Sequence, residues 1–221
     1  MRLLSRIGRL LFPPKCLLCE QILAPMELDI CRNCRINAPE CPVSGQKLPF
    51  VDSWVALWYY EGEVRRSILR FKFHGRRGRA KGFGRLLAMK LLQTYPEGFD
   101  LLTWVPTGRL RTLRRGYDQV ELLARAVGQE LGIAPTRLLK KVRNNPPQSG
   151  ISGRPQRRAN VLGAYRAVSP EQLAGKRILL LDDIITTGAT AGECARVLLT
   201  AGAEEVHCGA VASARRQAKT K

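Results

Sequence analysis

The sequence predicts an α/β protein with a mostly parallel sheet flanked by helices, preceded by a small cysteine-bearing module. Beyond residue 50, strand-like apolar runs alternate with amphipathic helical patterns, the order that right-handed crossovers between parallel strands produce. Five of the seven cysteines precede residue 43, which indicates a stapled module without a large core of its own. We therefore expect the module at residues 1–50 and the α/β domain at residues 51–221.

Length and hydropathy are consistent with one main core. The 221 residues, 45% of them hydrophobic, can bury one good core and leave a small accessory module. No apolar run approaches the roughly 18–20 residues that cross a bilayer. Arg6 and Arg9 interrupt the N-terminal stretch where a signal peptide needs unbroken apolar residues. We expect a soluble, cytoplasmic protein.

The chain is strongly basic. Lys and Arg total 37 against 18 Asp and Glu, a formal net charge of +19. Such an excess is typical of proteins that contact a polyanion or phosphorylated ligands. The basic residues cluster at 65–85, 109–115, 140–158 and 215–221, and for any single cluster a solvated surface is the alternative.

Strands and helices can be assigned in order. Residues 54–60 are rich in aromatic and apolar side chains like a buried strand, and residues 101–105 and 177–181 are similar. Apolar residues at helical spacing run from Phe83 to Leu91, from Val120 to Leu131 and from Cys194 to Ala201. Ligands of such a sheet bind outside the carboxyl ends of its strands.

The segment ILLLDDIITTGAT, residues 178–190, joins an apolar strand to two carboxylates, a tight turn and a helix start. Asp182 and Asp183 are expected at the carboxyl end of the strand, where they accept hydrogen bonds from hydroxyl groups. Gly188 permits close backbone approach, and the helix N-terminus favours a phosphate. The alternative is that these residues only cap the turn. The expected phosphate cradle consists of Thr186, Thr187, Gly188, Ala189 and Thr190.

Two other phosphate motifs are excluded: the chain has no Walker A loop and no dinucleotide-binding glycine motif after a strand. DDIITTGAT resembles the loop of the type I phosphoribosyltransferases that binds phosphoribosyl pyrophosphate (PRPP). The resemblance implies that Asp182 and Asp183, the catalytic candidates, hold the ribose hydroxyls. It implies that Thr186 to Thr190 hold the 5-phosphate and that Mg²⁺ bridges the pyrophosphate and the sugar.

Transfer in that family passes through an oxocarbenium-like state, so basic residues and Mg²⁺ must neutralise the departing pyrophosphate. The candidates for this role are Arg70, Lys72, Arg109, Arg114 and Arg115, of which Lys72, Arg109 and Arg115 are expected to bind PRPP.

Four cysteines have zinc-knuckle spacing. Cys16, Cys19, Cys31 and Cys34 form two C-x2-C pairs separated by eleven residues. Four thiolates close a tetrahedral Zn²⁺ site that has no position for water, so the metal would be structural. Disulfides are the alternative, which a cytoplasmic setting disfavours. Of the other thiols, Cys41 lies in the module, while Cys194 and Cys208 are expected in the core.

The combination of cysteine module and PRPP loop resembles the ComF family, competence-associated phosphoribosyltransferase-like proteins of bacteria. VPTGRLRTLRRGYDQVELLA from residue 105, QSGISGRPQRRANVLGAY from residue 148 and FKFHG from residue 71 are similar to family segments. The chain departs from the family after Cys41, where a further cysteine pair is usual, and carries about one extra residue after Gln148. Arg115, Gly116, Tyr117 and Gln119 are expected near the carboxyl edge of the sheet.

Two classes of function remain open. One is a Mg²⁺-dependent phosphoribosyltransferase with an unidentified acceptor, in which residues 143–160 form a loop that closes over PRPP. The other is a non-catalytic protein that binds single-stranded DNA beside the DNA-uptake helicase machinery, with PRPP as regulator or with no role. Aromatic residues near basic runs are few, namely Trp54, Trp58, Tyr59, Tyr60 and Tyr117, and those from Trp54 to Tyr60 suit the core better than base stacking.

Overall fold

The computed structural model describes residues 13–43, 47–73, 75–143 and 159–215. Four parallel strands form the central sheet, in the order β1-β6-β5-β2. A second sheet pairs two short strands antiparallel. The predicted α/β architecture with a mostly parallel sheet is confirmed. The strands are β1 (Ser53–Tyr59), β2 (Leu101–Trp104), β3 (Leu139–Lys141), β4 (Tyr165–Ala167), β5 (Arg177–Ile185) and β6 (Glu205–Ser213).

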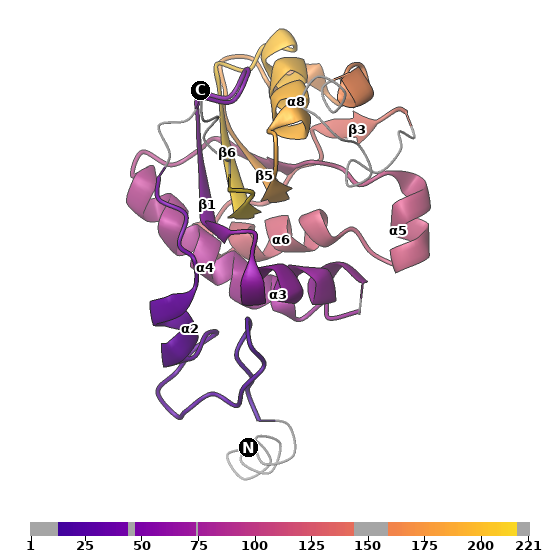
Figure 1. The fold of residues 1–221 in the computed structure, drawn as a ribbon. Helices are drawn as coiled ribbons and strands as arrows, with labels where there is room; N and C mark the ends of the chain where they lie inside the picture. The colour runs from indigo at the N-terminus through magenta and orange to yellow at the C-terminus, as the bar shows by residue number, and fades with distance from the viewer. Residues whose placement is uncertain (1–12, 44–46, 74, 144–158, 216–221) are drawn as a thin grey trace, which may run out of the picture.

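Helices cover both faces of the central sheet (Figure 1). One face packs against α3 (Gly62–Phe73), α4 (Arg79–Thr94) and α6 (Gln119–Leu131), and the other against α8 (Ala189–Thr200) and the β3–β4 pair. Successive strand residues point to opposite faces. Leu179 and Leu181 therefore join the cluster under α4 and α6, while Ile178 and Leu180 join the cluster under α8. The three helices expected from apolar spacing are all present.

Strand β5 is longer than its apolar run predicts. We expected it to end before Asp182, but its pairing with β6 continues to Ile185. The shorter β2 pairs only as far as Leu181. Among the described residues no strand pairs with β5 on the β2 side beyond Leu181, so Asp182 and Asp183 lie within the strand yet beside an open edge.

The N-terminal segment packs on the α3 and α4 side of the domain. Leu17 and Leu18 are buried in the same apolar cluster as Ile68 and Phe83. The smaller elements are the helices α2 (Arg32–Asn37) and α5 (Arg109–Arg115) and the 3₁₀ helix η2 (Pro170–Gln172). The loop expected over residues 143–160 falls, at 144–158, outside the described residues.

Candidate functional site

A tight turn connects β5 to α8. Gly188 precedes the helix with a φ of +77°, a left-handed conformation that favours glycine. A Cβ placed there would lie 2.4 Å from Cδ2 of Leu48, so space as well as conformation excludes a side chain. The hydroxyl of Thr187 accepts a hydrogen bond from the N–H of Ala189 at 3.3 Å, which tightens the turn.

A hollow of about 40 Å³ lies in this turn. Its lining is contributed by the end of β5, the turn and the first residues of α8. The N–H groups of a first helical turn have no acceptors within the helix, and the helix dipole is positive there. The hollow therefore suits a compact anion. Its lining residues are Asp182, Ile184, Ile185, Thr186, Gly188, Ala189, Thr190 and Ala191.

Asp183 is held by two side chains from different helices. Its Oδ1 lies 2.8 Å from Nζ of Lys72, on the last turn of α3, and the carboxylate is 8% exposed. Its Oδ2 accepts a hydrogen bond of 2.9 Å from Nε2 of Gln119, at the start of α6. Gln119 in turn accepts one of 2.7 Å from Nη1 of Arg115. Lys72 and Gln119 thus contact Asp183 directly, and Arg115 contacts it through Gln119. All three residues were named from the sequence.

Asp182 has a different environment. Burial, together with the like charge of Asp183, raises the pKa of Asp182 to about 8. Its carboxylate accepts a hydrogen bond of 2.8 Å from the N–H of Asp183. A cation or a hydroxyl donor near Asp182 would therefore favour its charged form.

Both hollow and carboxylates open into a cleft of about 940 Å³. Six basic and two acidic side chains line it, so the charge of the cleft favours anionic ligands. On one side the loop after β2 is fixed by Asp118, which accepts hydrogen bonds of 2.9 Å and 3.1 Å from the N–H and hydroxyl of Thr107. Burial raises the pKa of Asp118. The basic lining residues are Arg65, Lys72, Arg111, Arg114, Arg115 and Lys141.

The structure separates the basic candidates. Lys72, Arg114 and Arg115 line the cleft, whereas Arg70 is turned toward the cysteine module, 3.3 Å from a carboxylate oxygen of Glu20. The expectation that Arg70 serves the phosphate site is wrong, because two residues along α3 turn its side chain away from Lys72. Arg109 begins α5 beside the cleft, but its side chain lies outside the described atoms.

Sequence reasoning missed Lys141 and Arg111. Burial, with the charge of Arg111 beside it, lowers the pKa of Lys141. Lys141 Nζ lies 5.5 Å from the ring centroid of Tyr165, across the β3–β4 pair. Both cations belong to basic clusters visible in the sequence, but the pairing of β3 with β4 brings Lys141 to the cleft, and the position of α5 brings Arg111 there. Tyr117 and Gln119, which the sequence predicted near the carboxyl edge of the sheet, line the cleft.

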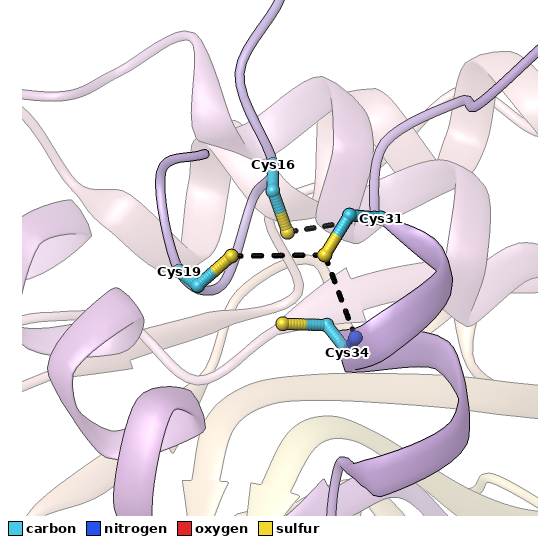
Figure 2. A group of neighbouring side chains, drawn as sticks. All are labelled: Cys16, Cys19, Cys31 and Cys34. Carbon is cyan, nitrogen blue, oxygen red and sulfur yellow. Dashed lines mark hydrogen bonds between the residues drawn. The ribbon is translucent and has the colours of Figure 1, made fainter. Parts of the chain in front are cut away.

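The four cysteines at zinc-knuckle spacing come together (Figure 2). Their sulfur atoms lie within 4.8 Å of one another, and Cys19 Sγ is 3.7 Å from Cys31 Sγ. Tetrahedral coordination with Zn–S bonds of about 2.3 Å requires sulfurs about 3.8 Å apart. None of the seven cysteines, all within the described residues, forms a disulfide. The cluster is compatible with a structural zinc ion.

The pKa values of thiols in this cluster are shifted in different directions. Burial alone would raise the pKa of Cys16, but hydrogen bonds from backbone N–H groups outweigh it and lower the pKa to about 7. Burial and the neighbouring thiols raise the pKa of Cys34. Several buried thiolates at such spacing repel one another unless a cation lies between them. Cys41 lies apart from the group, whereas Cys194 and Cys208 are buried core residues, as expected.

The knuckle is hydrogen-bonded to α3, which lines the cleft, and to α4. The hydroxyl of Ser67 donates to the carbonyl oxygen of Leu17, and Arg79 donates to the same oxygen. Arg79 also lies 2.5 Å from Glu20. The backbone of the first cysteine pair is thereby attached to α3 and α4.

This chain is similar to a protein family and to several known proteins. A family model described as "Phosphoribosyl transferase domain" matches residues 113–221. The chain is 28% identical to "Competence protein F" of Haemophilus influenzae over 226 residues, covering 90% of this chain and 97% of that protein. It is 30% identical to "DNA utilization protein YhgH" of Salmonella typhimurium over 217 residues, covering 88% and 94%.

Among solved structures, a glutamine phosphoribosylpyrophosphate amidotransferase from B. subtilis is similar with a TM-score of 0.44 and 23% sequence identity. The likeness covers 65% of this chain and 30% of that chain. Within the described residues, no helix has the length and apolar character needed to cross a membrane.

Proposed function

The chain belongs to the ComF family of phosphoribosyltransferase-domain proteins, and we propose that it binds PRPP with Mg²⁺ in the cleft and transfers ribose 5-phosphate to an acceptor. Because relatives are named for competence and DNA utilization, the proposal includes an association with DNA uptake and natural transformation. One observation carries the proposal: the buried carboxylate of Asp183, paired with Lys72 and Gln119, stands beside an anion-binding turn in a basic cleft.

The turn would hold the 5-phosphate of PRPP. The N–H groups of residues 186–190 and the hydroxyls of Thr186, Thr187 and Thr190 are the donors, and the dipole of α8 favours the dianion. Asp182 and Asp183 would accept hydrogen bonds from the ribose hydroxyls. Because Lys72 and Gln119 hold Asp183 in place, its oxygens are oriented before the sugar binds.

Cleavage of the bond to pyrophosphate needs charge neutralisation. Mg²⁺, when bound, would supply positive charge to the pyrophosphate and sugar oxygens. Lys72 and Arg115, which line the cleft, would stabilise the departing pyrophosphate, and Arg109 is proposed for the same role. The carboxylate of Asp183 beside the sugar favours the positive charge that develops at the anomeric carbon.

The proposal includes a structural Zn²⁺ on Cys16, Cys19, Cys31 and Cys34, in a module of residues 1–50 attached to a phosphoribosyltransferase domain of residues 51–221. A cytoplasmic location suits this arrangement, since thiols there stay reduced and available to zinc.

Calorimetric titration with PRPP, with and without Mg²⁺, tests the proposal, followed by an assay of pyrophosphate release over a panel of nucleobases. We expect binding that Mg²⁺ strengthens and that Asp183→Asn weakens at least tenfold. Glu171→Gln, an exposed carboxylate on η2, is the matched control and should bind like the wild type. A wild-type protein without affinity for PRPP would contradict the proposal.

A second function is favoured by the basic lining of the cleft and the relatives' names: a non-catalytic protein that binds single-stranded DNA alongside the DNA-uptake helicase machinery. Affinity for an oligonucleotide would then fall with salt, with a slope of about −0.7 per phosphate contacted. Binding that does not depend on salt would exclude this function.

A further inference from the structure

Phe73 is an exposed aromatic residue on the wall of the cleft. It is the last residue of α3, its side chain is 60% exposed, and its ring contributes to the cleft lining. The apolar stripe of α3 that packs under the sheet consists of Val64, Ile68 and Phe71, all fully buried. Phe73 lies off this stripe, so packing of the helix does not account for it.

The Phe73 ring is connected to Asp183 through Arg115 and Gln119. The guanidinium carbon of Arg115 lies 4.8 Å from the ring centroid of Phe73, a cation–π contact. Arg115 is oriented by its hydrogen bond to Gln119, which donates to Asp183. Lys72, the neighbour of Phe73 in the chain, pairs with the same carboxylate. The ring is therefore linked through Arg115 to the proposed ribose site.

A second arginine–aromatic pair nearby has a different character. Arg77 lies 4.8 Å from the ring centroid of Tyr117, but Tyr117 is only 8% exposed and its hydroxyl donates to the carbonyl oxygen of Phe71. Tyr117 thus has a structural role, because its ring is buried and its hydroxyl is hydrogen-bonded within the protein. Phe73 differs because most of its surface is open to a ligand.

Charges around the ring indicate the class of ligand. Arg65 and Arg114, both exposed, line the same cleft as Phe73, and Leu69 and Tyr60 add apolar surface. A planar ring stacks favourably on an aromatic side chain, and arginines bind phosphates. A ligand that carries a nucleobase together with phosphate groups matches both features.

We propose that Phe73, backed by Arg115, is a stacking platform for a nucleobase of the acceptor, which carries phosphate groups that Arg65 and Arg114 bind. The identification of this ligand as the acceptor rests on the proposed function. The shared chemistry, a base and its phosphates, is present both in a mononucleotide and in a single DNA strand.

The test uses the full-length zinc-loaded chain and two labelled strands of equal length, oligothymidylate and an abasic strand that lacks bases. Fluorescence anisotropy should show that Phe73→Ala weakens oligothymidylate binding roughly 5- to 100-fold while abasic binding is unchanged. Phe73→Trp should retain or improve base-dependent binding. Arg114→Gln should weaken both strands alike, because it removes a phosphate contact. Thymidine monophosphate, titrated by calorimetry, distinguishes a small acceptor from a strand.

Leu92→Ala is the matched control, since Leu92 is an apolar residue of α4 with 54% exposure that does not line the cleft. If Phe73→Ala binds oligothymidylate and thymidine monophosphate as the wild type does, the platform is wrong. PRPP affinity, measured on the same variant, should be unchanged. Loss of base-dependent binding in Phe73→Ala with intact PRPP affinity would support this inference alone. Absence of PRPP binding in the wild type would instead contradict the proposed function.

Discussion

Lys72 and Asp183 form an ion pair inside the cleft, with 2.8 Å between Nζ and Oδ1. The lysine is on the last turn of α3 and the carboxylate on β5, more than a hundred residues further along the chain. Their side chains are 17% and 8% exposed, so water screens the pair only weakly. The pair connects α3, which is hydrogen-bonded to the cysteine module, to β5, the strand that leads into the turn before α8.

Replacing one partner of this pair should destabilise the protein. Lys72→Met removes the cation beside the largely buried carboxylate of Asp183, which then keeps its hydrogen bond from Gln119. We expect the unfolding free energy to fall by about 1–3 kcal/mol at pH 7. Lys72→Met with Asp183→Asn should cost less than the two single changes added together, because the unpaired charge is gone. Denaturant unfolding of the four proteins measures the coupling. Lys81→Met, at an exposed position on α4, is the control. If the free-energy losses of Lys72→Met and Asp183→Asn simply add in the double variant, the coupling is contradicted.

Asp182 should make the stability of the ligand-free protein depend on pH. Its pKa is raised from an ordinary 3.8 to about 8, so the folded state retains the proton over a range in which the unfolded chain releases it. Stability therefore falls as the pH rises from about 4 to about 8, and Asp182→Asn lacks this loss. We expect the variant to gain on the order of 1–3 kcal/mol over the wild type at pH 8.5, since water in the cleft reduces the full effect.

Unfolding curves of wild type and Asp182→Asn, recorded without PRPP or added Mg²⁺, provide the measurement. The difference between the two proteins should become small below about pH 3, where Asp182 is protonated in both the folded and the unfolded state. Because it is a difference, effects of cysteine protonation on the zinc site cancel. A difference that stays constant across this range would show that Asp182 ionises normally.

Gly188→Ala should damage the turn. A φ of +77° and a Cβ only 2.4 Å from Leu48 Cδ2 combine conformational strain with overlap, and we expect a loss of about 2–4 kcal/mol. Gly98→Ala is the matched control because it has a similar φ of +71° with open space around the Cβ, and should cost about 1 kcal/mol. Thermal unfolding compares them. Adding Leu48→Ala should recover part of the loss at Gly188 and none at Gly98.

The cysteine cluster should hold about one zinc ion per chain. Cys19→Ser or Cys34→Ser should release it and lower the melting temperature by several degrees, because the closed site loses a ligand and its binding energy contributes to folding. Cys41→Ser should keep its zinc, since Cys41 lies outside the group. Metal analysis of the purified proteins decides the point, and a zinc content unchanged by Cys34→Ser would exclude the four-thiol site.

The features that the sequence alone determined are local ones. The spacing of the two cysteine pairs, the apolar periods of three helices and the succession from Ile178 to Thr190 each depend on residues within a turn or two of one another. Their physical basis is short range: the reach of a C-x2-C turn to one ion, the alternation of a strand, the conformational freedom of Gly188. Each could therefore be predicted without knowing which elements are neighbours in space.

Only the tertiary structure decided which distant side chains meet the carboxylates. A basic cluster offers many cations, but the angle at which α3 crosses the sheet brings Lys72 to Asp183 and turns Arg70 to Glu20. The same packing exposes Phe73, and the pairing of β3 with β4 brings Lys141 into the cleft. Rotation of a helix and register between remote strands are set by the packing of the whole core, which no short stretch of sequence encodes.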